Sequence, residues 1–335
     1  MSNPPPAARL GQMLCGFWVS QAIYVTAKLG LADLIQDDSV SAGELAAKTN
    51  THRLSLYRLL RMLASVGVFV EDDQQQFRLT EVGQCLRSDV EASQRAMAIM
   101  SCEEHFRAWC DLLYSVQTGK PAFDKVFGMP VFDWYSQHPD QAAIFDAAMV
   151  SVHGRETAAV LEAYDFSNIQ TLADVGGGNG SVLIATLQAN PHLRGMLFDL
   201  PGVISRATPN IAAAGLSDRC QLLSGSFFES IPAGADAYMM RHIIHDWNDE
   251  QCLTILKNIH SVLPANGRLL VSESVIPPGN DPFFGKLLDL NMLVIPGGQE
   301  RTAAEYETLF AKAGFRLTRI VPTSTELSII EGQKA

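Results

Sequence analysis

The chain has 335 residues, of which 47% are hydrophobic and 18% are charged, and its formal net charge is −11. This length allows two domains, the composition is that of an ordinary globular protein, and the negative charge argues against a nucleic-acid partner. No stretch approaches the roughly 18 uninterrupted apolar residues of a membrane span, and the first residues lack the pattern of a signal peptide.

The first elements of the chain are expected to be helical. Apolar residues recur at helical spacing over positions 10–35, with a break at Gly30. Ser41 and Glu44 have the spacing of a capping box, which predicts a short helix over positions 44–48.

A second helix and a β-hairpin follow. The helix is predicted over positions 53–66 and ends at Gly67, and the hairpin strands are predicted over 68–70 and 77–79. Two short helices followed by a hairpin form a winged-helix pattern, which we assign to a first domain over residues 1–95.

A winged helix raises the alternative of DNA binding. The candidate recognition helix carries Arg53, Arg58 and Arg61, but acids at positions 71–73 of the hairpin would repel phosphate. The helix also has more apolar residues than one core-facing stripe requires. A protein–protein interface explains this surplus better than DNA does.

The next segment, residues 96–165, is predicted to be helical and is rich in aromatic residues. Most of these side chains are expected to form core. A few could line an apolar substrate pocket, and the candidates here are Trp109, Met149 and His153, with Asn291 added from a later part of the chain.

From about position 168 onward, strands alternate with helices, which predicts a parallel sheet covered on both faces. Two more strands are predicted over 315–321 and 326–330. The earlier strands are predicted to end at Val175, Asp199, Ser224, Met240 and Glu273. Ligands bind at the carboxyl ends of parallel strands, so this third segment, residues 166–335, is expected to carry the site along one edge.

The first of these strands runs into a glycine-rich loop. Gly176, Gly178 and Gly180 follow Asp174, and a helix is predicted over 181–188. The G-x-G-x-G spacing differs from the G-x-G-x-x-G of dinucleotide sites, and an acid before the loop suits a cationic ligand better than a pyrophosphate.

Asp199 ends the next strand, where a carboxylate can bind both hydroxyls of a ribose. The combination predicts S-adenosylmethionine (SAM) as the cofactor. The residues expected to bind it are Asp174, Gly176, Gly178, Asp199, Leu200, Gly225, Ser226, Phe227 and Arg241.

His245 is the candidate catalytic residue because it lies between a predicted strand end and a helix that Asn248 and Gln251 open. Imidazole titrates near neutrality and can take a proton from a hydroxyl. Glu273 and Glu300 could orient the ring and stabilise the imidazolium. The alternatives are a local loop hydrogen bond for His245 and a capping or surface role for Glu300.

No metal site is predicted. The six cysteines form no C-x-x-C pair and lie at no zinc spacing. Reduced thiols of this kind are consistent with a cytoplasmic protein.

Three motifs together resemble those of the SAM-dependent small-molecule O-methyltransferases typified by plant caffeate and flavonoid enzymes, a family with bacterial relatives in antibiotic, phenazine and carotenoid pathways. They are Asp174-Val-Gly-Gly-Gly-Asn-Gly180, His245-Asp-Trp247 and Pro296-Gly-Gly-Gln-Glu300-Arg-Thr302. The resemblance covers residues 12–331.

The resemblance implies a Rossmann-like class I methyltransferase domain with a mostly parallel seven-stranded sheet, preceded by a mainly α winged-helix dimerisation domain. It implies a homodimer, His245 as general base flanked by Glu273 and Glu300, and Arg241 where plant members carry a lysine near the adenine. One departure is Ser226, since the family usually has an aspartate there. We expect SAM binding to survive this change.

The sequence therefore predicts a metal-independent enzyme that methylates a hydroxyl, expected to be phenolic, of a small aromatic or polyketide-like metabolite. Two alternatives remain. The same fold and cofactor could serve hydroxylation, decarboxylation or pericyclic chemistry, or the chain could be a SAM-sensing regulator.

Overall fold

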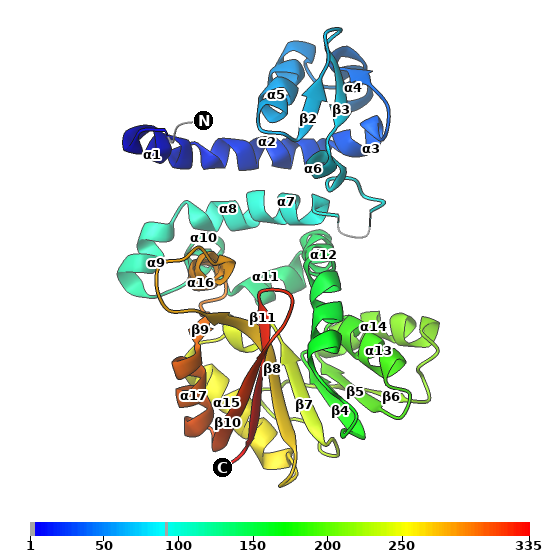
Figure 1. Ribbon diagram of the computed structural model, residues 1–335, viewed down its shortest axis with the longest axis vertical. Helices are drawn as coiled ribbons and strands as arrows, with labels where there is room; N and C mark the ends of the chain where they lie inside the picture. Colours follow the sequence, from blue (N-terminus) through cyan, green and yellow to red (C-terminus); the bar gives the residue numbers. More distant parts are fainter. Residues whose placement is uncertain (1–3, 91–92) are drawn as a thin grey trace. The chain divides into compact units, whose positions relative to one another are not determined.

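The computed structural model describes residues 4–90 and 93–335, and at positions 152, 153 and 155 only the backbone is described. Contacts divide the chain into two compact units (Figure 1). One unit comprises Met1–Cys110 and Val131–Gly154, and the other comprises Asp111–Pro130 and Arg155–Ala335. The three-part division predicted from sequence stays a prediction.

The N-terminal helices confirm the predicted break at Gly30, which has a left-handed φ of 64°. The structure also has a break at Cys15 that the apolar spacing did not predict. The three helices are α1 (Pro6–Leu14), α2 (Gly16–Leu29) and α3 (Leu31–Ile35).

The winged-helix elements follow as predicted. Ser41 and Glu44 form the capping box of α4 (Ala42–Thr49), and α5 (Arg53–Ser65) follows. A small antiparallel sheet in the order β1-β3-β2 covers their buried side chains. Its strands are β1 (Val40–Ser41), β2 (Phe69–Glu71) and β3 (Gln76–Leu79), of which β1 was not predicted.

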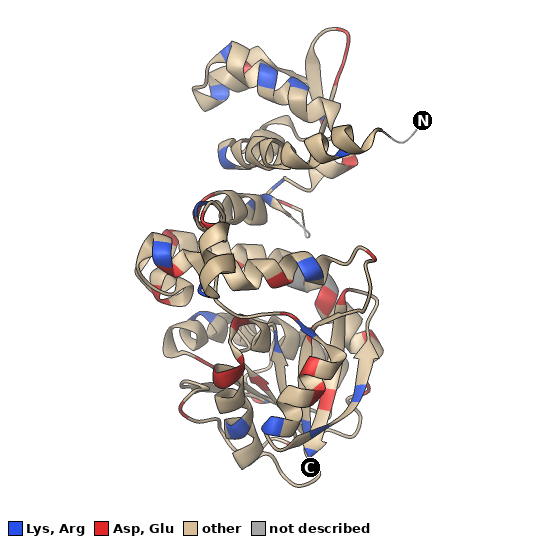
Figure 2. Ribbon diagram, turned by 90° about the vertical axis from the view of Figure 1, so that its left-hand side faces the viewer, with Lys and Arg blue, Asp and Glu red and all other residues tan. Residues whose placement is uncertain are grey.

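Charge on this winged-helix region is distributed as the sequence suggests. Figure 2 shows acidic residues at the tip of the β2–β3 hairpin and basic bands on helices of the same region. The expectation that the protein binds no nucleic acid stays a prediction.

The middle of the chain is helical, as predicted. The helices of this segment are α7 (Arg95–Cys102), α8 (Glu104–Trp109), α9 (Leu112–Thr118), α10 (Ala122–Phe127), α11 (Val131–Gln137) and α12 (Pro139–Ala163). The short α6 (Glu81–Gln84), which precedes them, was not predicted. Helix α12 begins in the first unit and ends in the second.

The second unit contains the large sheet, in the order β10-β11-β8-β7-β4-β5-β6. Its strands are β4 (Thr171–Val175), β5 (Arg194–Asp199), β6 (Cys220–Ser224), β7 (Ala237–Arg241), β8 (Arg268–Ile276), β10 (Phe315–Pro322) and β11 (Leu327–Lys334). All pairs from β8 to β6 are parallel, whereas β11 is antiparallel to both β8 and β10.

Several predicted strand ends are wrong. The strand predicted to end at Met240 includes Arg241, the one predicted to end at Glu273 continues to Ile276, and the one predicted over 326–330 continues to Lys334. The second extension is stabilised by pairing on both sides, with β11 and with the short β9 (Arg301–Thr302). Glu273 therefore lies inside a buried strand.

Helices cover both faces of this sheet (Figure 1). They are α13 (Ser181–Ala189), α14 (Pro201–Ala213), α15 (Asp249–Val262) and α17 (Ala303–Lys312), whereas α16 (Phe284–Val294) contacts α9 and β8. Because strand side chains alternate between faces, Tyr238 and Met240 belong to the core under α15 and α17, and Ala237 and Met239 to the core under α13 and α14.

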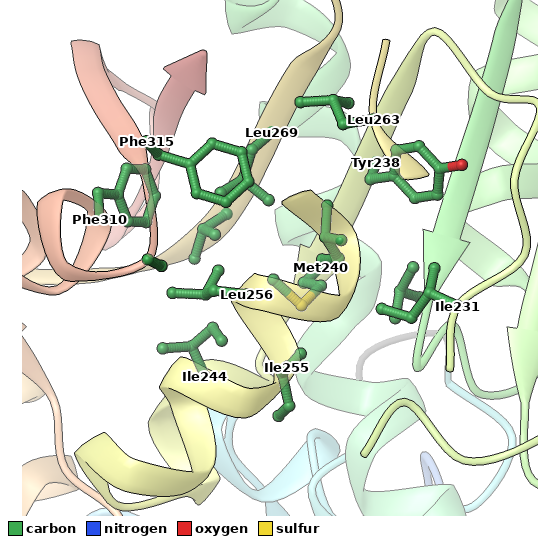
Figure 3. Packing of buried hydrophobic residues seen from close by; sticks show 14 of the residues in the cluster. Ile231, Tyr238, Met240, Ile244, Ile255, Leu256, Leu263, Leu269, Phe310 and Phe315 are labelled. Carbon is green, nitrogen blue, oxygen red and sulfur yellow. The ribbon is translucent and has the colours of Figure 1, made fainter. Parts of the chain in front are cut away.

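Figure 3 shows the first of these cores, where Ile244 packs with Ile255 and Leu256 of α15. Ile244 immediately precedes His245, so the candidate catalytic loop is anchored in the hydrophobic core. Among the described helices, none has the length and apolar character needed to cross a membrane.

Candidate active site

The glycine loop between β4 and α13 adopts a backbone conformation that favours glycine. Gly176, Gly178 and Gly180 have φ values of 72°, 59° and 80°. A Cβ on Gly177 would lie 2.6 Å from Oδ2 of Asp174, whereas one on Gly178 would meet nothing within 4 Å. The loop therefore covers Asp174 closely and leaves open space beside Gly178.

Asp199 joins this loop to the end of β5. Its Oδ2 accepts the N–H of Gly178 at 2.9 Å, and its Oδ1 accepts the N–H of Leu200 at 2.7 Å. A carboxylate has about four acceptor positions, and these two bonds use one on each oxygen. The arrangement fits a ligand that presents neighbouring hydroxyls, such as a ribose.

Asp174 lies beneath the loop and is buried. Burial raises the pKa of its carboxyl to about 7, and the charge of Asp199 adds to this rise while Arg241 opposes it. Its Oδ2 accepts no hydrogen bond from any residue that the structure describes. A buried acceptor of this kind fits a site that receives a cationic ligand nearby.

The loop after β6 lies beside Asp199, because the N–H of Gly225 donates to the Asp199 carbonyl at 3.0 Å. A Cβ on Gly225 would lie 2.9 Å from the ring of Phe198, so glycine permits this approach. Ser226, at the position of the family's aspartate, accepts the N–H of Phe228 at 3.3 Å. The ring of Phe227 packs edge-on to Phe228.

Arg241 ends β7, and its Nη1 donates to Oγ1 of Thr157 in α12 at 3.0 Å. Burial lowers the pKa of this guanidinium, and the charges of Glu156 and Asp174 oppose that shift. The predicted cofactor residues thus lie in the loops and strand ends along the carboxyl edge of β4, β5, β6 and β7. The donor and acceptor set fits SAM.

His245 lies in a short 3₁₀ turn, Ile244–Asp246, directly after this edge. Its Nδ1 forms a 2.6 Å hydrogen bond with Oε1 of Glu300, and both side chains are buried. Oδ1 of Asp246 is 3.6 Å from the other ring nitrogen, Nε2, which exceeds hydrogen-bond length. Glu300 is therefore neither a surface acid nor a helix cap.

The pKa values of this turn reflect its crowded carboxylates. Burial alone would lower the pKa of the His245 imidazole, but Asp246 and Glu300 raise it to about 10. Burial raises the pKa of the Asp246 carboxyl to about 7, although the imidazole acts in the opposite direction. The turn therefore has a high affinity for protons.

Glu273 contacts the backbone of this turn, not the ring. Its Oε1 accepts the N–H groups of Ile243 at 3.0 Å, Ile244 at 2.6 Å and His245 at 3.2 Å. Its Oε2 accepts the hydroxyl of Tyr306 at 2.7 Å. The orienting role expected of two acids is thus divided between Glu300 at the ring and Glu273 at the backbone.

Sequence reasoning missed a second histidine–carboxylate pair. His242 Nε2 lies 2.9 Å from Oε2 of Glu156 in α12, and the His242 ring centroid is 5.0 Å from that of His245. His242 also has a φ of 54°, which is unusual for a residue other than glycine. Its place three residues before His245 was the only local signal, since Glu156 is distant in sequence.

The predicted acceptor residues lie in separate parts of the chain. Trp109 ends α8 and Met149 is in α12, both in the first unit, whereas Asn291 is in α16 of the second. His153 is also in α12, but its side chain lies outside what the structure describes. Within the described residues, no three His, Cys, Asp or Glu side chains are grouped as metal ligands.

Comparison with known proteins identifies the family. A model of the O-methyltransferase domain matches residues 109–316, and a model of the O-methyltransferase dimerisation domain matches residues 12–89. The chain belongs to the SAM-dependent O-methyltransferase family. The matched dimerisation region includes the winged-helix elements, and the larger match includes the whole glycine loop and the His245 turn.

Individual relatives cover almost the whole chain. Phenazine O-methyltransferase PhzM of Lysobacter antibioticus is 46% identical over 98% of this chain and 96% of its own. The crystal structure of LaPhzM superposes with a TM-score of 0.95 at 45% identity, covering 99% of this chain and all of that one. The class I methyltransferase fold expected from the sequence is thereby confirmed.

Two other relatives bear on the cofactor and the reaction. The O-methyltransferase NcsB1 from neocarzinostatin biosynthesis was crystallised with SAM and a hydroxy-methyl-naphthoic acid. It is 34% identical to this chain with a TM-score of 0.85, and the match covers 94% of this chain and 96% of NcsB1. SAM is thus the family's cofactor. Aclacinomycin 10-hydroxylase RdmB of Streptomyces purpurascens is named for a different reaction, a hydroxylation. It is 38% identical over 88% of this chain and 81% of the RdmB chain.

Proposed function

We propose that this methyltransferase acts on a phenolic hydroxyl of a small aromatic molecule, with His245 as the general base. The 2.6 Å hydrogen bond between Nδ1 of His245 and Oε1 of Glu300 carries the proposal. Because an ionised carboxylate only accepts hydrogen bonds, Nδ1 is the donor, and the neutral ring keeps its lone pair on Nε2.

When bound, SAM supplies a methyl group attached to a cationic sulfur, and this sulfur is a good leaving group. The chain contributes positioning and proton removal. Nε2 of His245 would take the hydroxyl proton, so that the acceptor oxygen could receive the methyl group that SAM would supply. Glu300 then stabilises the imidazolium that results, and Glu273 keeps the turn in place.

The cofactor assignment of individual residues belongs to the same proposal. Asp199 would accept the ribose hydroxyls, and Leu200, whose side chain is exposed, would pack on the adenine. Arg241 and the loop at Gly225 would complete the adenosine side of the site, and Gly178 would allow close approach of the amino-acid tail.

An aromatic acceptor is supported by the relatives, one named for phenazine methylation and one crystallised with a naphthoic acid. The acceptor residues predicted from the sequence, Trp109, Met149, His153 and Asn291, stay part of this proposal.

We also infer that the protein is a homodimer. The dimerisation-domain match is one support, and a run of exposed large apolar side chains on α1 and α2 is another. These exposed residues are Leu10, Met13, Leu14, Phe17 and Trp18.

The test is incubation with methyl-labelled SAM and a panel of phenols, with products analysed by mass spectrometry. Replacing His245 with alanine should lower methyl transfer by about 10²–10⁴, the usual contribution of a general base, while calorimetry shows little change in SAM affinity. The control is His192→Ala, an exposed histidine, which should keep the wild-type rate. A wild-type kcat in His245→Ala on a neutral phenol at saturating SAM, with the affinity for SAM strongly reduced, would reassign His245 to the cofactor site.

The runner-up is a reaction other than methylation with the same fold and cofactor, which the relationship to RdmB supports. In the labelling experiment it predicts products that carry no label on any acceptor, while the protein still binds SAM.

A further inference from the structure

Arg301 is a buried arginine that contacts the turn carrying the candidate base. Its side chain is only 1% exposed. Nη1 donates to the carbonyl of Ile244 at 3.2 Å, and Nη2 donates to the carbonyl of Trp247 at 3.2 Å. These two carbonyls flank the dipeptide His245–Asp246, so one guanidinium holds the turn at both ends.

The counter-ion of Arg301 is Asp249, which follows the His245 turn in the chain. Oδ1 of Asp249 is 2.9 Å from Nη2 and 3.3 Å from Nε, and it also accepts Nε2 of Gln299 at 3.0 Å. Asp249 is the first residue of α15, which begins directly after the turn. The Arg301–Asp249 pair therefore connects β9 to both sides of the His245 turn.

The neighbours of Arg301 contact His245 as well. The N–H of Gln299 donates to the His245 carbonyl at 2.9 Å, and a Cβ on Gly298 would overlap that carbonyl at 1.9 Å. Glu300 binds the ring. One continuous segment, positions 298–301, thus contacts the carbonyl, the ring and the flanking backbone of the base.

Glu273 and Arg301 act on opposite polar groups of the turn. The carboxylate of Glu273 accepts its N–H groups, and the guanidinium of Arg301 donates to its carbonyls. A buried anion and a buried cation therefore fix the same few residues. Both are held in turn, Glu273 by Tyr306 and Arg301 by Asp249.

We propose that Arg301, held by Asp249, is a positioning residue that sets where Nε2 of His245 lies relative to the acceptor hydroxyl. The inference rests on the proposed function, since it gives Arg301 a role only through His245. A displacement of about 1 Å in such a group can cost about 10²-fold in rate. The fork of an arginine is needed because the single ammonium of a lysine cannot bond two carbonyls and a carboxylate in this fixed geometry.

The test replaces Arg301 with lysine in wild type and in His245→Ala. In wild type, kcat on a neutral phenol should fall by about 10–100-fold, with SAM affinity changed by less than about twofold. In His245→Ala, the same replacement should cause no further loss. With a phenol that is already ionised at the assay pH, Arg301→Lys should have little effect, because no proton has to be removed.

The matched control is Arg268→Lys, at the other end of β8. Arg268 is less buried than Arg301, with 27% of its side chain exposed, and its Nη1 donates to the Tyr164 hydroxyl at 3.2 Å. This change should lower the melting temperature without altering kcat. If Arg301→Lys does not fold, Asp249→Asn replaces it in the test. Asp249 is half-exposed, so its substitution is easier to tolerate, and it removes only the counter-ion of Arg301. Asp249→Asn should lower kcat by a smaller factor than Arg301→Lys in wild type, and it should cause no further loss of kcat in His245→Ala.

Equal losses of kcat in the two backgrounds, or equal losses on ionised and neutral phenols, would overturn the proposal and leave Arg301 as a stabilising residue only. An unimpaired His245→Ala variant would instead show that the base assignment itself is wrong. The two failures are thus distinguishable.

Discussion

The hydroxyl of Tyr306 donates a 2.7 Å hydrogen bond to Oε2 of Glu273, the carboxylate whose other oxygen accepts three backbone N–H groups of the His245 turn. Both side chains are fully buried. Burial and the charge of Glu273 hold the pKa of the Tyr306 phenol well above its usual range, so the phenol remains a donor. A residue of α17 thereby supports the turn after β7.

Tyr306→Phe should therefore destabilise the fold. Removing the hydroxyl leaves a buried carboxylate oxygen without its donor, which costs about 1–3 kcal/mol in the free energy of unfolding. Urea unfolding measures this loss. The control is Tyr24→Phe, which removes a 2.8 Å bond to Glu103 at a partly buried site and should cost less. Equal stability of Tyr306→Phe and wild type would contradict the support assigned to Tyr306.

Asp199→Ala should weaken SAM binding. Asp199 holds the N–H groups of Gly178 and Leu200, and in the proposed site it also accepts the ribose hydroxyls. Charge-assisted hydrogen bonds contribute roughly 1.5–3 kcal/mol each, so the dissociation constant should rise by at least about tenfold. Calorimetry measures it, with the exposed Asp218→Asn as control. An unchanged affinity would remove Asp199 from the cofactor site.

Much of the second unit could be predicted because its signals are local. Strand ends at Val175, Asp199 and Ser224 follow from short apolar runs that stop at polar or turn residues, and the structure confirms all three. The capping boxes at Ser41 and Asn248 are confirmed for the same reason, since each needs only four consecutive residues.

The interactions that complete the candidate site join residues that are distant in sequence, so they could not be predicted from the sequence. Glu156 meets His242 across 86 positions, and Arg301 meets Ile244 across 57. The tertiary packing decides such contacts: Glu156 is in helix α12, whereas Arg301 is brought to the end of β8 by the pairing of β9. The sequence could name Glu273 as a partner of His245, but not that it binds the backbone of the turn.

Asp174→Asn should change how stability depends on pH. Burial raises the pKa of Asp174 to about 7 in the folded protein, above its value in the unfolded chain. Between these values the folded state binds more protons than the unfolded state, so this group lowers stability as the pH rises through that window. Asparagine carries no such charge.

The free energy of unfolding of Asp174→Asn minus that of wild type should therefore increase between about pH 4 and about pH 7 and stay constant above it. Urea unfolding across this range measures the trend. The exposed Asp218→Asn serves as the control and should show no comparable trend. A difference between Asp174→Asn and wild type that stays constant with pH would mean that Asp174 is not a buried titrating group.

Replacing an exposed apolar residue of α2 with a charged one should disrupt the proposed homodimer. Phe17 and Trp18 are 52% and 57% exposed. A glutamate at either position would bury a carboxylate in an apolar interface, which is unfavourable without a partner. Light scattering after size exclusion should show monomers, whereas Val82→Glu on α6, 63% exposed, should stay dimeric. A dimeric Trp18→Glu variant would place the interface elsewhere.

The rate of methyl transfer to a neutral phenol should rise with pH, because the pKa of His245 is raised to about 10 and only the neutral imidazole is a base. As the pH increases toward that value, the neutral fraction increases about tenfold per unit. Glu300→Gln removes one of the charges that raise this pKa, so the midpoint should move to lower pH. The maximal rate should also fall, since the ring is a weaker base and loses its orienting carboxylate.

An ionising acceptor would give a similar rise, so the profile has to be measured with several phenols of different acidity. If His245 titrates, the midpoint stays the same for all of them and moves only in Glu300→Gln. If the acceptor titrates, the midpoint follows the phenol and is insensitive to Glu300. A midpoint that moves to higher pH in Glu300→Gln would contradict the arrangement in which this carboxylate stabilises the protonated ring.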